Sequence, residues 1–139
     1  MNKQYFVAIG VITNEKGDIL LSQRDDTLSP YSHKKWQLPG GGVDHGEHPK
    51  EALIREIEEE TGIKIAITNN HPKVFSHVFL EKNTHVVILA YPAVYVSGTI
   101  DISQDEDTAD AKWFAYDTID FSTCLPLTKD IIDEIRKAQ

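Results

Sequence analysis

Residues 41–63 read GGVDHGEHPKEALIREIEEETGI and contain the clearest helix signal in the chain. Pro49 suits the first helical position, because its missing N–H and fixed φ cost nothing there, and this makes His48 the expected N-cap. The residues from Lys50 to Thr61 are all compatible with a helix, and Gly62 is a natural stop after its C-terminal end. The stretch therefore predicts one helix between these two boundaries.

Three glutamates of this helix share one face. Glu56, Glu59 and Glu60 are neighbours because residues three and four apart meet on a helix, and each like-charge pair costs roughly 0.2–0.5 kcal/mol. Leu53 and Ile57 lie on the adjoining face, which we expect to pack against a sheet. One interpretation is a solvated acidic face. The other is a site for a hard divalent cation such as Mg²⁺, which takes oxygen ligands and bridges carboxylates to phosphates. The glycines just upstream favour the metal site, since their carbonyls can reach the same place.

The same stretch resembles the Nudix box. That pattern is Gly, five residues, Glu, seven residues, Arg-Glu-aliphatic, one residue, Glu-Glu, one residue, and Gly-aliphatic. Every fixed position is matched, by Gly41, Glu47, Arg55, Glu56, Ile57, Glu59, Glu60, Gly62 and Ile63. The surroundings are also similar to the family, with a lead-in at Trp36–Gly41, an Arg24 that closes a predicted strand, and a Trp113-Phe114 pair after an acidic loop.

The resemblance implies both a fold and an activity. The fold is α+β, or mixed α/β: the Nudix fold, an α/β/α sandwich with a mixed central sheet. The activity is hydrolysis of a phosphoric anhydride bond in a nucleoside diphosphate linked to another moiety, with Mg²⁺ as cofactor and Mn²⁺ as a substitute. The length of 139 residues agrees with a single domain over residues 1–139, which can bury one core without disulfides.

The resemblance also assigns roles within the box. Glu56, Glu59 and Glu60 become the metal ligands, and the backbone carbonyl of Gly40 or Gly41 becomes a further one. A water near the metal is then the attacking group, and a carboxylate takes its proton. Glu56 and Glu59 are the catalytic candidates for that step.

The remaining charged residues of the box are given supporting roles. Glu47 is expected to position the box, and Arg55 to pair with Glu59 rather than to touch substrate. The base can also come from outside the box, where residues 105–107 are acidic. Glu106 is one candidate there, for proton transfer or for substrate binding. The alternative is that these acidic side chains only face solvent.

Composition and charge limit the partners. The chain has 22 acidic and 14 basic residues, a formal charge of −8 and no basic stripe, so its field repels nucleic-acid polymers and anionic membranes. A small-molecule nucleotide is compatible with that charge when a cation bridges the two. No segment is apolar enough to span a bilayer, and the single Cys124 cannot form an internal disulfide, so a cytoplasmic location is expected. A homodimer is compatible with the sequence, but no apolar stripe forces it.

The other elements follow from period-two and helical patterns. A hairpin of Tyr5–Thr13 and Asp18–Gln23 is expected to open the chain, and a helix over Thr128–Lys137 to close it. Further strands are expected at Ile63–Thr68, Val74–Glu81, Thr84–Val96 and Lys112–Tyr116, with polar loops over residues 25–35 and 103–110.

Candidate substrate contacts lie outside the box. Tyr31 and Trp36 flank a polar loop and could stack on a nucleobase, a contact worth about 1–3 kcal/mol in other systems. Core packing is the alternative for Trp36. His77 and Phe79 alternate along a predicted strand and share one face, where they line either a base pocket or the core. Arg24 is the cationic member of this set.

Features around the box narrow the substrate class. The marks associated with hydrolases of NADH, ADP-ribose, dinucleoside polyphosphates and coenzyme A are absent, and Pro72 comes too early for the ADP-ribose mark. Without these marks, the chain resembles the small mutator-type (MutT-like) enzymes. These enzymes hydrolyse a (d)NTP, including oxidised ones, to the monophosphate and pyrophosphate. The alternatives are a nucleotide-sugar or ADP-ribose-type pyrophosphatase, the processing of RNA 5′ ends, and a non-catalytic nucleotide-sensing Nudix domain.

Overall fold

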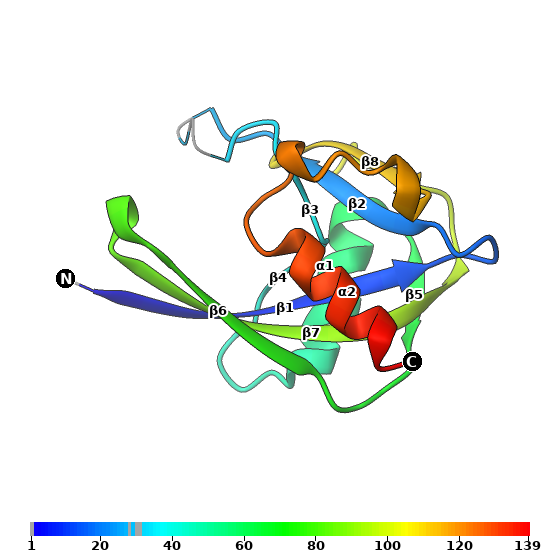
Figure 1. Ribbon diagram of the computed structural model, residues 1–139, viewed down its shortest axis with the longest axis horizontal. Helices are drawn as coiled ribbons and strands as arrows, with labels where there is room; N and C mark the ends of the chain where they lie inside the picture. Colours follow the sequence, from blue (N-terminus) through cyan, green and yellow to red (C-terminus); the bar gives the residue numbers. More distant parts are fainter. Residues whose placement is uncertain (1, 28, 30–31) are drawn as a thin grey trace.

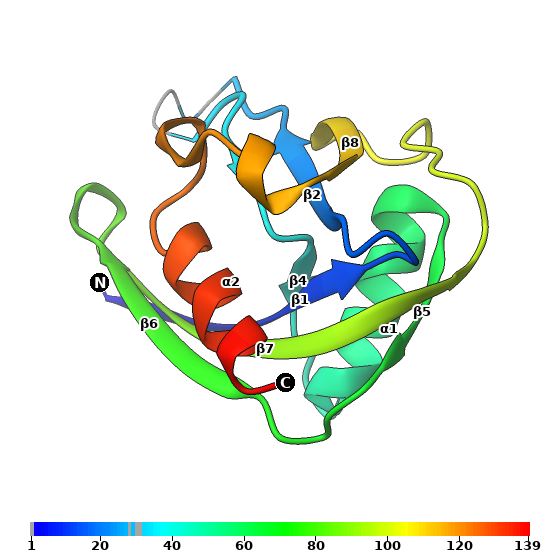
Figure 2. The ribbon, with the colours of Figure 1, turned by 45° about the vertical axis from the view of Figure 1, so that its right-hand side comes forward.

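One mixed β-sheet runs through the molecule, with a helix against each face (Figures 1 and 2). The computed structural model describes residues 2–27, 29 and 32–139. Helix α1 (Pro49–Thr61) covers one face, and helix α2 (Thr128–Lys137) covers the other. The expected α/β/α sandwich with a mixed sheet is therefore confirmed. Within the described residues, no helix combines the length and apolarity needed to cross a membrane.

The sheet has eight strands in the described part of the chain. They are β1 (Lys3–Thr13), β2 (Ile19–Arg24), β3 (Trp36–Gln37), β4 (Gly40–Gly42), β5 (Lys64–Ile67), β6 (Lys73–Phe79), β7 (Thr84–Ser97) and β8 (Thr108–Phe114). Three short 3₁₀ helices are η1 (Leu80–Lys82), η2 (Tyr116–Thr118) and η3 (Phe121–Thr123). β1 and β7 pair in parallel at the centre, and the other pairings are antiparallel.

The predicted opening hairpin exists only at its turn. β1 and β2 share a single residue pair, Thr13 with Ile19, and then diverge. β1 continues in parallel with β7 from Lys3 to Thr13, whereas β2 pairs with β8 and β3. Alternating apolar residues identify a strand but not its partner, because every strand of a buried sheet presents a similar pattern. The long parallel pairing of the two central strands was therefore not foreseen.

The two helices have the boundaries that the sequence predicts. His48 caps α1, since its Nδ1 accepts a hydrogen bond from the backbone N–H of Lys50 at 3.1 Å. Gly62 ends the helix in the left-handed region, at φ 76°, and its N–H donates to the carbonyl of Glu58. These contacts satisfy backbone groups that a helix end would otherwise leave unpaired.

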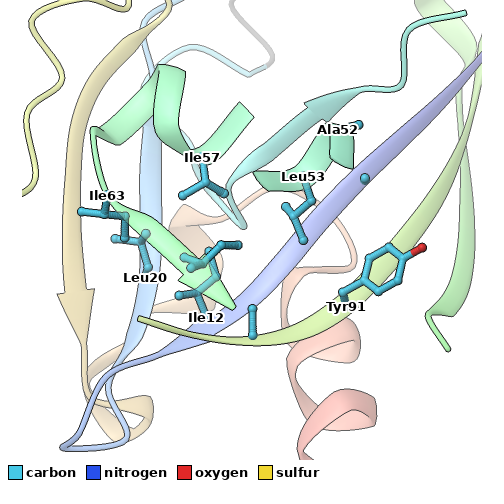
Figure 3. Close-up of a cluster of buried hydrophobic side chains, with 10 residues drawn as sticks. Ile12, Leu20, Ala52, Leu53, Ile57, Ile63 and Tyr91 are labelled. Atoms are coloured by element: carbon cyan, nitrogen blue, oxygen red, sulfur yellow. The ribbon is translucent and has the colours of Figure 1, made fainter. Parts of the chain in front are cut away.

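Each face of the sheet carries its own apolar cluster. Ala8 and Ile12 of β1 point toward α1, where they meet Leu53 and Ile57 (Figure 3). Residues in between, such as Val11, point toward α2. Burial of a large aliphatic side chain stabilises the fold by about 1.5–3 kcal/mol, so the apolar side of α1 fixes the helix firmly on the sheet. Its acidic side is then held at a defined place relative to β4.

The glycines before α1 form a short strand. β4 pairs antiparallel with β1, and Ala8 lies opposite Gly41. The backbones approach each other closely here. Gly40 has φ 148°, and a Cβ atom built there would lie 2.1 Å from the carbonyl oxygen of Ala8. A Cβ on Gly41 would lie 2.4 Å from Cδ of Glu56, so the Glu56 carboxyl group occupies the space that a side chain at position 41 would need.

Two smaller boundaries also differ from the sequence expectation. β8 begins at Thr108, inside the predicted acidic loop, and ends at Phe114. The dipeptide Trp36-Gln37 forms β3, which no pattern in so short a segment indicates. Both strands pair with β2, so β2 has two partner strands that the sequence did not assign.

The glycines of β4 give a matched test of this packing. Gly40→Ala is expected to lower the free energy of unfolding by at least about 2 kcal/mol, because it adds a backbone clash and an unfavourable φ. Gly42→Ala, where no atom lies within 4 Å of the added carbon, is expected to change it by less than about 0.5 kcal/mol. Urea unfolding of both variants measures the difference, and equal stabilities would contradict the proposed close approach.

Candidate active site

The three glutamates of α1 line a polar cavity of about 440 Å³. It lies between the C-terminal half of α1, strand β4 and the loop that precedes β8. Its walls are formed by Arg24, Gln37, Gly40, Glu56, Glu59, Glu60, Gln104, Asp105, Asp107 and Thr108. Five of these side chains are carboxylates and one is a guanidinium. The cavity therefore concentrates negative charge in one place, and we call it the carboxylate pocket.

Arg55 binds several acidic groups at the rim of this pocket. Its Nε and Nη2 donate to the two oxygens of Glu47 at 2.8 and 3.0 Å, which is a bidentate arrangement. Its Nη1 donates to Glu56 at 3.1 Å and to Glu59 at 3.2 Å. The expected contact with Glu59 is present, but the contact with Glu47 is shorter. Arg55 holds the pKa of the Glu47 carboxyl below its usual value, and the carboxylates together raise the pKa of Arg55.

Glu60 is the buried member of the group, with 6% of its surface exposed. One of its oxygens accepts a hydrogen bond from the backbone N–H of Gly40 at 3.2 Å. Burial, followed by the charges of Glu56 and Asp105, raises the pKa of Glu60 to about 8. Burial also raises the pKa of Glu56, although Arg55 opposes the shift. The pocket thus holds carboxyl groups whose negative charge is incompletely compensated by the protein.

These residues fit a hard divalent cation. All the donor atoms offered by Glu56, Glu59 and Glu60 are oxygens, and the raised pKa values mark a place where added positive charge is favourable. In the described residues, no three His, Cys, Asp or Glu side chains are already arranged around one point as metal ligands. Glu56 and Glu59 instead share Arg55, and Glu60 accepts from Gly40.

A second cavity, of about 240 Å³, adjoins the first. We call it the apolar cavity, because most of the residues around it are hydrophobic. It is lined by Val7, Ile9, Arg24, Gln37, Leu38, Gly40, Gly41, His77, Phe79, Val86, Ile88, Leu125, Pro126, Thr128 and Ile131. Three of these residues, Arg24, Gln37 and Gly40, also line the carboxylate pocket. The two cavities therefore meet at a common wall.

Arg24 occupies that common wall. Its Nη1 donates to Oε1 of Gln37 at 3.3 Å, and its Nη2 lies 3.5 Å from Oδ2 of Asp26. Its Nε is buried and has no hydrogen-bond partner among the described residues. A buried donor without a partner costs about 1–3 kcal/mol. The Arg24 side chain as a whole is 34% exposed, so a ligand would reach the guanidinium through its Nη groups.

The predicted substrate contacts fall into two groups. Arg24, His77 and Phe79 line the apolar cavity, as does Gly41 from the box. Trp36 does not line either cavity; its ring packs edge-on against Phe114, with centroids 5.0 Å apart. Trp36 thus packs against the apolar cluster under α2, an arrangement that matches the alternative given for it from the sequence. Tyr31 lies outside the described residues.

Two of the three acidic residues at 105–107, which the sequence offers as candidate bases, line the site. Asp105 and Asp107 line the carboxylate pocket, but Glu106 between them does not. The loop is tied to the end of β2 by a hydrogen bond from the N–H of Asp25 to the carbonyl of Asp107, at 2.8 Å. Gln37 was missed altogether, because a lone glutamine in a two-residue strand carries no sequence signal.

Comparison with known proteins identifies the family. The NUDIX domain pattern matches residues 4–134. The chain belongs to the Nudix hydrolase family. A solved structure of a MutT Nudix hydrolase from Burkholderia pseudomallei superimposes with a TM-score of 0.81, at 28% identity, over 96% of this chain and 99% of that one. The Nudix fold that the sequence predicts is thereby confirmed, and members of this family typically depend on a divalent metal and act on nucleotides.

Two curated relatives carry names that bear on substrate. An RNA pyrophosphohydrolase from Cereibacter sphaeroides is 49% identical over 53 residues, which is 38% of this chain and 30% of that protein. An 8-oxo-dGTP diphosphatase from Escherichia coli K12 is 36% identical over 61 residues, 44% of this chain and 46% of that protein. The chain thus spans less than half the length of either relative.

Titration of Glu60 predicts how stability depends on pH. The folded carboxyl keeps its proton up to about pH 8, whereas the unfolded one loses it near pH 4.5. Between these values the unfolded state binds fewer protons, so the free energy of unfolding of the metal-free protein falls as pH rises. Glu60→Gln is therefore expected to match wild type near pH 4.5 and to exceed it at pH 8, by on the order of 1–3 kcal/mol.

Urea unfolding in the presence of a chelator, at both pH values, tests this expectation. Glu58→Gln is the matched control, because Glu58 is on the exposed side of the same helix and pairs with Lys64 at the surface. If the free energy of unfolding of Glu60→Gln equals that of wild type at both pH values, the raised pKa of Glu60 is contradicted.

Proposed function

We propose that this chain is a Mg²⁺-dependent pyrophosphohydrolase that converts a nucleoside triphosphate to the monophosphate and pyrophosphate. In the proposed reaction, water attacks a phosphorus atom, and the phosphoric anhydride bond to the leaving pyrophosphate breaks. Family membership supports the reaction class. The partial likeness to the 8-oxo-dGTP diphosphatase, at 36% identity over 61 residues, supports a nucleoside triphosphate substrate.

One observation carries the proposal: the apolar cavity and the carboxylate pocket share a wall. A nucleotide has the same two parts, an apolar planar base and a charged phosphate chain, joined by a sugar. The apolar cavity is suited to the base, with His77 and Phe79 in T-shaped contact at 4.5 Å between centroids along one side. The carboxylate pocket is suited to a metal-bound phosphate chain.

Different residues of the box are proposed to bind the metal, to transfer a proton and to position the carboxylates. Glu56, Glu59 and Glu60 would hold the cation, with the carbonyl of Gly40, which lines the same pocket, or of Gly41 as a further oxygen ligand. When bound, Mg²⁺ or Mn²⁺ neutralises phosphate charge and lowers the pKa of a coordinated water. Glu56 or Glu59 would accept the proton of the attacking water, since each points into the pocket from the same helix face. Glu47 and Arg55 position these carboxylates through the contacts described above.

Arg24 would bind the nucleotide where its base joins its phosphates. The residue lines both cavities, and 34% of its side chain is exposed. A phosphate or sugar oxygen at the wall would accept a hydrogen bond from the Nη groups of its guanidinium. This contact gives the chain a direct cationic interaction with an anionic substrate, despite a formal charge of −8.

A substrate panel with Mg²⁺ tests the proposal. It contains canonical and oxidised dNTPs, nucleotide sugars, ADP-ribose and a short RNA with a 5′-triphosphate, with products identified by mass. Monophosphate and pyrophosphate from one triphosphate would support the proposal and name the base. Turnover confined to sugar-linked diphosphates or to the RNA would replace it with one of those activities. Nucleotide binding without any turnover would indicate a sensing domain.

The glutamates can be tested individually. Glu56→Gln, Glu59→Gln and Glu60→Gln are each expected to lower kcat by roughly 10²–10⁴-fold while the far-UV circular dichroism is unchanged. The reason is that each substitution removes a negative oxygen donor without changing the size of the side chain. Glu58→Gln, which is outside the pocket, should retain wild-type turnover. Near wild-type activity in any of the three pocket variants would remove that residue from the proposed metal site.

Arg24→Lys tests the shared wall. It keeps the positive charge but removes the Nε–H and the planar fork, so KM is expected to rise roughly 10–100-fold with a smaller change in kcat. Arg136→Lys is the control, because Arg136 lies over the Tyr116 ring, 4.3 Å from its centroid, and lines neither cavity. An unchanged KM in Arg24→Lys would show that Arg24 does not bind the substrate.

A further inference from the structure

The start of β1, strand β6, helix η1 and the start of β7 form a projecting arm at one end of the sheet (Figures 1 and 2). Several apolar side chains of this arm are exposed. Val74 and Val78 of β6 are 64% and 52% exposed, Phe6 of β1 is 56% exposed, and Leu80 at the tip is 83% exposed. Such a concentration of apolar surface outside the proposed active site is typical of a protein–protein contact.

β6 is also an edge strand whose one charged residue is Lys73, at its start. It pairs with β7 along its whole length, in continuous register from Lys73 to Phe79, and with no other described strand. Edge strands normally avoid intermolecular pairing through charged residues, proline or a bulge. Residues 74–79 read VFSHVF, which contains no proline and no Asp, Glu, Lys or Arg, and the register has no bulge. No other element lies alongside the outer edge of β6 in either view (Figures 1 and 2).

We propose that β6 pairs antiparallel with β6 of a second copy of this chain, about a two-fold axis through Ser76. The two sheets then join into one continuous sheet across the dimer. A two-fold axis that relates antiparallel neighbouring strands is perpendicular to the sheet and passes midway between the two copies of one residue. The same face of each sheet then lies on the same side of the dimer. Centring on Ser76 is the register that pairs every residue of Lys73–Phe79.

The strand is self-complementary in this register. Val74 of one copy would lie beside Val78 of the other, so the two exposed valines of β6 make a cross-strand contact at two symmetric positions. Phe75 lies opposite His77, and Ser76 lies opposite itself. This symmetry favours a second copy over an unrelated strand, because no other partner would need the same spacing. The arm carries Lys3, Lys73 and Lys82 beside one acidic residue, Glu81, so it is less acidic than a chain whose formal charge is −8.

Light scattering and sedimentation, over roughly 1–200 μM protein, measure the oligomeric state. Wild type is expected to be a dimer, and Val78→Lys to weaken association at least about tenfold, since it places a charge on the edge at two symmetric positions. Val96→Lys is the matched control: Val96 is 56% exposed on the distant end of β7, and this variant should remain a dimer. A monomeric wild type, an open series of larger assemblies, or a dimeric Val78→Lys would overturn the proposal.

The register itself can be tested by charge reversal. Val74→Glu and Val78→Lys should each weaken the dimer, and the double variant should restore it, because Glu at 74 then faces Lys at 78 of the other copy. Within one chain these positions are four residues apart along a strand, roughly 13 Å, so they cannot pair internally. A double variant that associates no better than the single variants would overturn this register.

Crosslinking gives a measurement that does not depend on the valines. Directly opposed residues in an antiparallel pair have Cα atoms about 4.5–5.5 Å apart, which is within the range of a disulfide. In a Cys124→Ser background, Ser76→Cys is expected to form an intermolecular disulfide under mild oxidation. Val78→Cys should form far less, because it lies opposite Val74 and not opposite itself. Equal crosslinking of the two variants, or none in Ser76→Cys, would overturn the proposal.

Discussion

The guanidinium of Arg55 is the interaction on which the acidic site depends. It binds both oxygens of Glu47 and, through a third nitrogen, reaches Glu56 and Glu59. Without it, the loop before α1 would have no ionic connection to the acidic face of the helix, and the neighbouring carboxylates would repel one another. Charge-assisted, bidentate contacts are strong enough to fix geometry as well as charge. The carboxylates therefore have defined positions before any cation or substrate arrives.

The backbone of β4 supplies the other half of this constraint. Gly40 donates its N–H to the buried Glu60, and Gly41 leaves room for the carboxyl group of Glu56. A side chain at Gly40 would meet the backbone of β1, and one at Gly41 would displace the Glu56 carboxyl group. The fold and the site are thus stabilised by the same contacts. The buried, acid-rich pocket is unfavourable for the metal-free protein, as the raised pKa of Glu60 indicates, and this is the expected property of a place built to receive positive charge.

The sequence predicted the helices and the acidic face well, because local rules determine them. Proline at the start, glycine at the end and the spacing of Glu56, Glu59 and Glu60 require no knowledge of the rest of the chain. Strand partners were harder to predict, since the parallel pairing of β1 with β7 joins segments about eighty residues apart and depends on the whole sheet. Gln37 and Arg24 illustrate the same limit. Each lies at the end of a strand, and only the folded sheet brings the two within hydrogen-bonding distance.

Side chains of β6 alternate between the two faces of the sheet, so the strand makes a different kind of contact on each face. His77 and Phe79 point into the apolar cavity, whereas Val74 and Val78 point to the opposite face and remain exposed. Neighbouring residues of a strand face opposite ways, so a change at a valine leaves the cavity side chains in place. The backbone of β6 is nevertheless common to both faces. Pairing of β6 with a second copy would fix that backbone, and with it the positions of His77 and Phe79 against a bound base. The edge of the sheet and the base cavity would then be coupled through the strand that they share, although no side chain belongs to both.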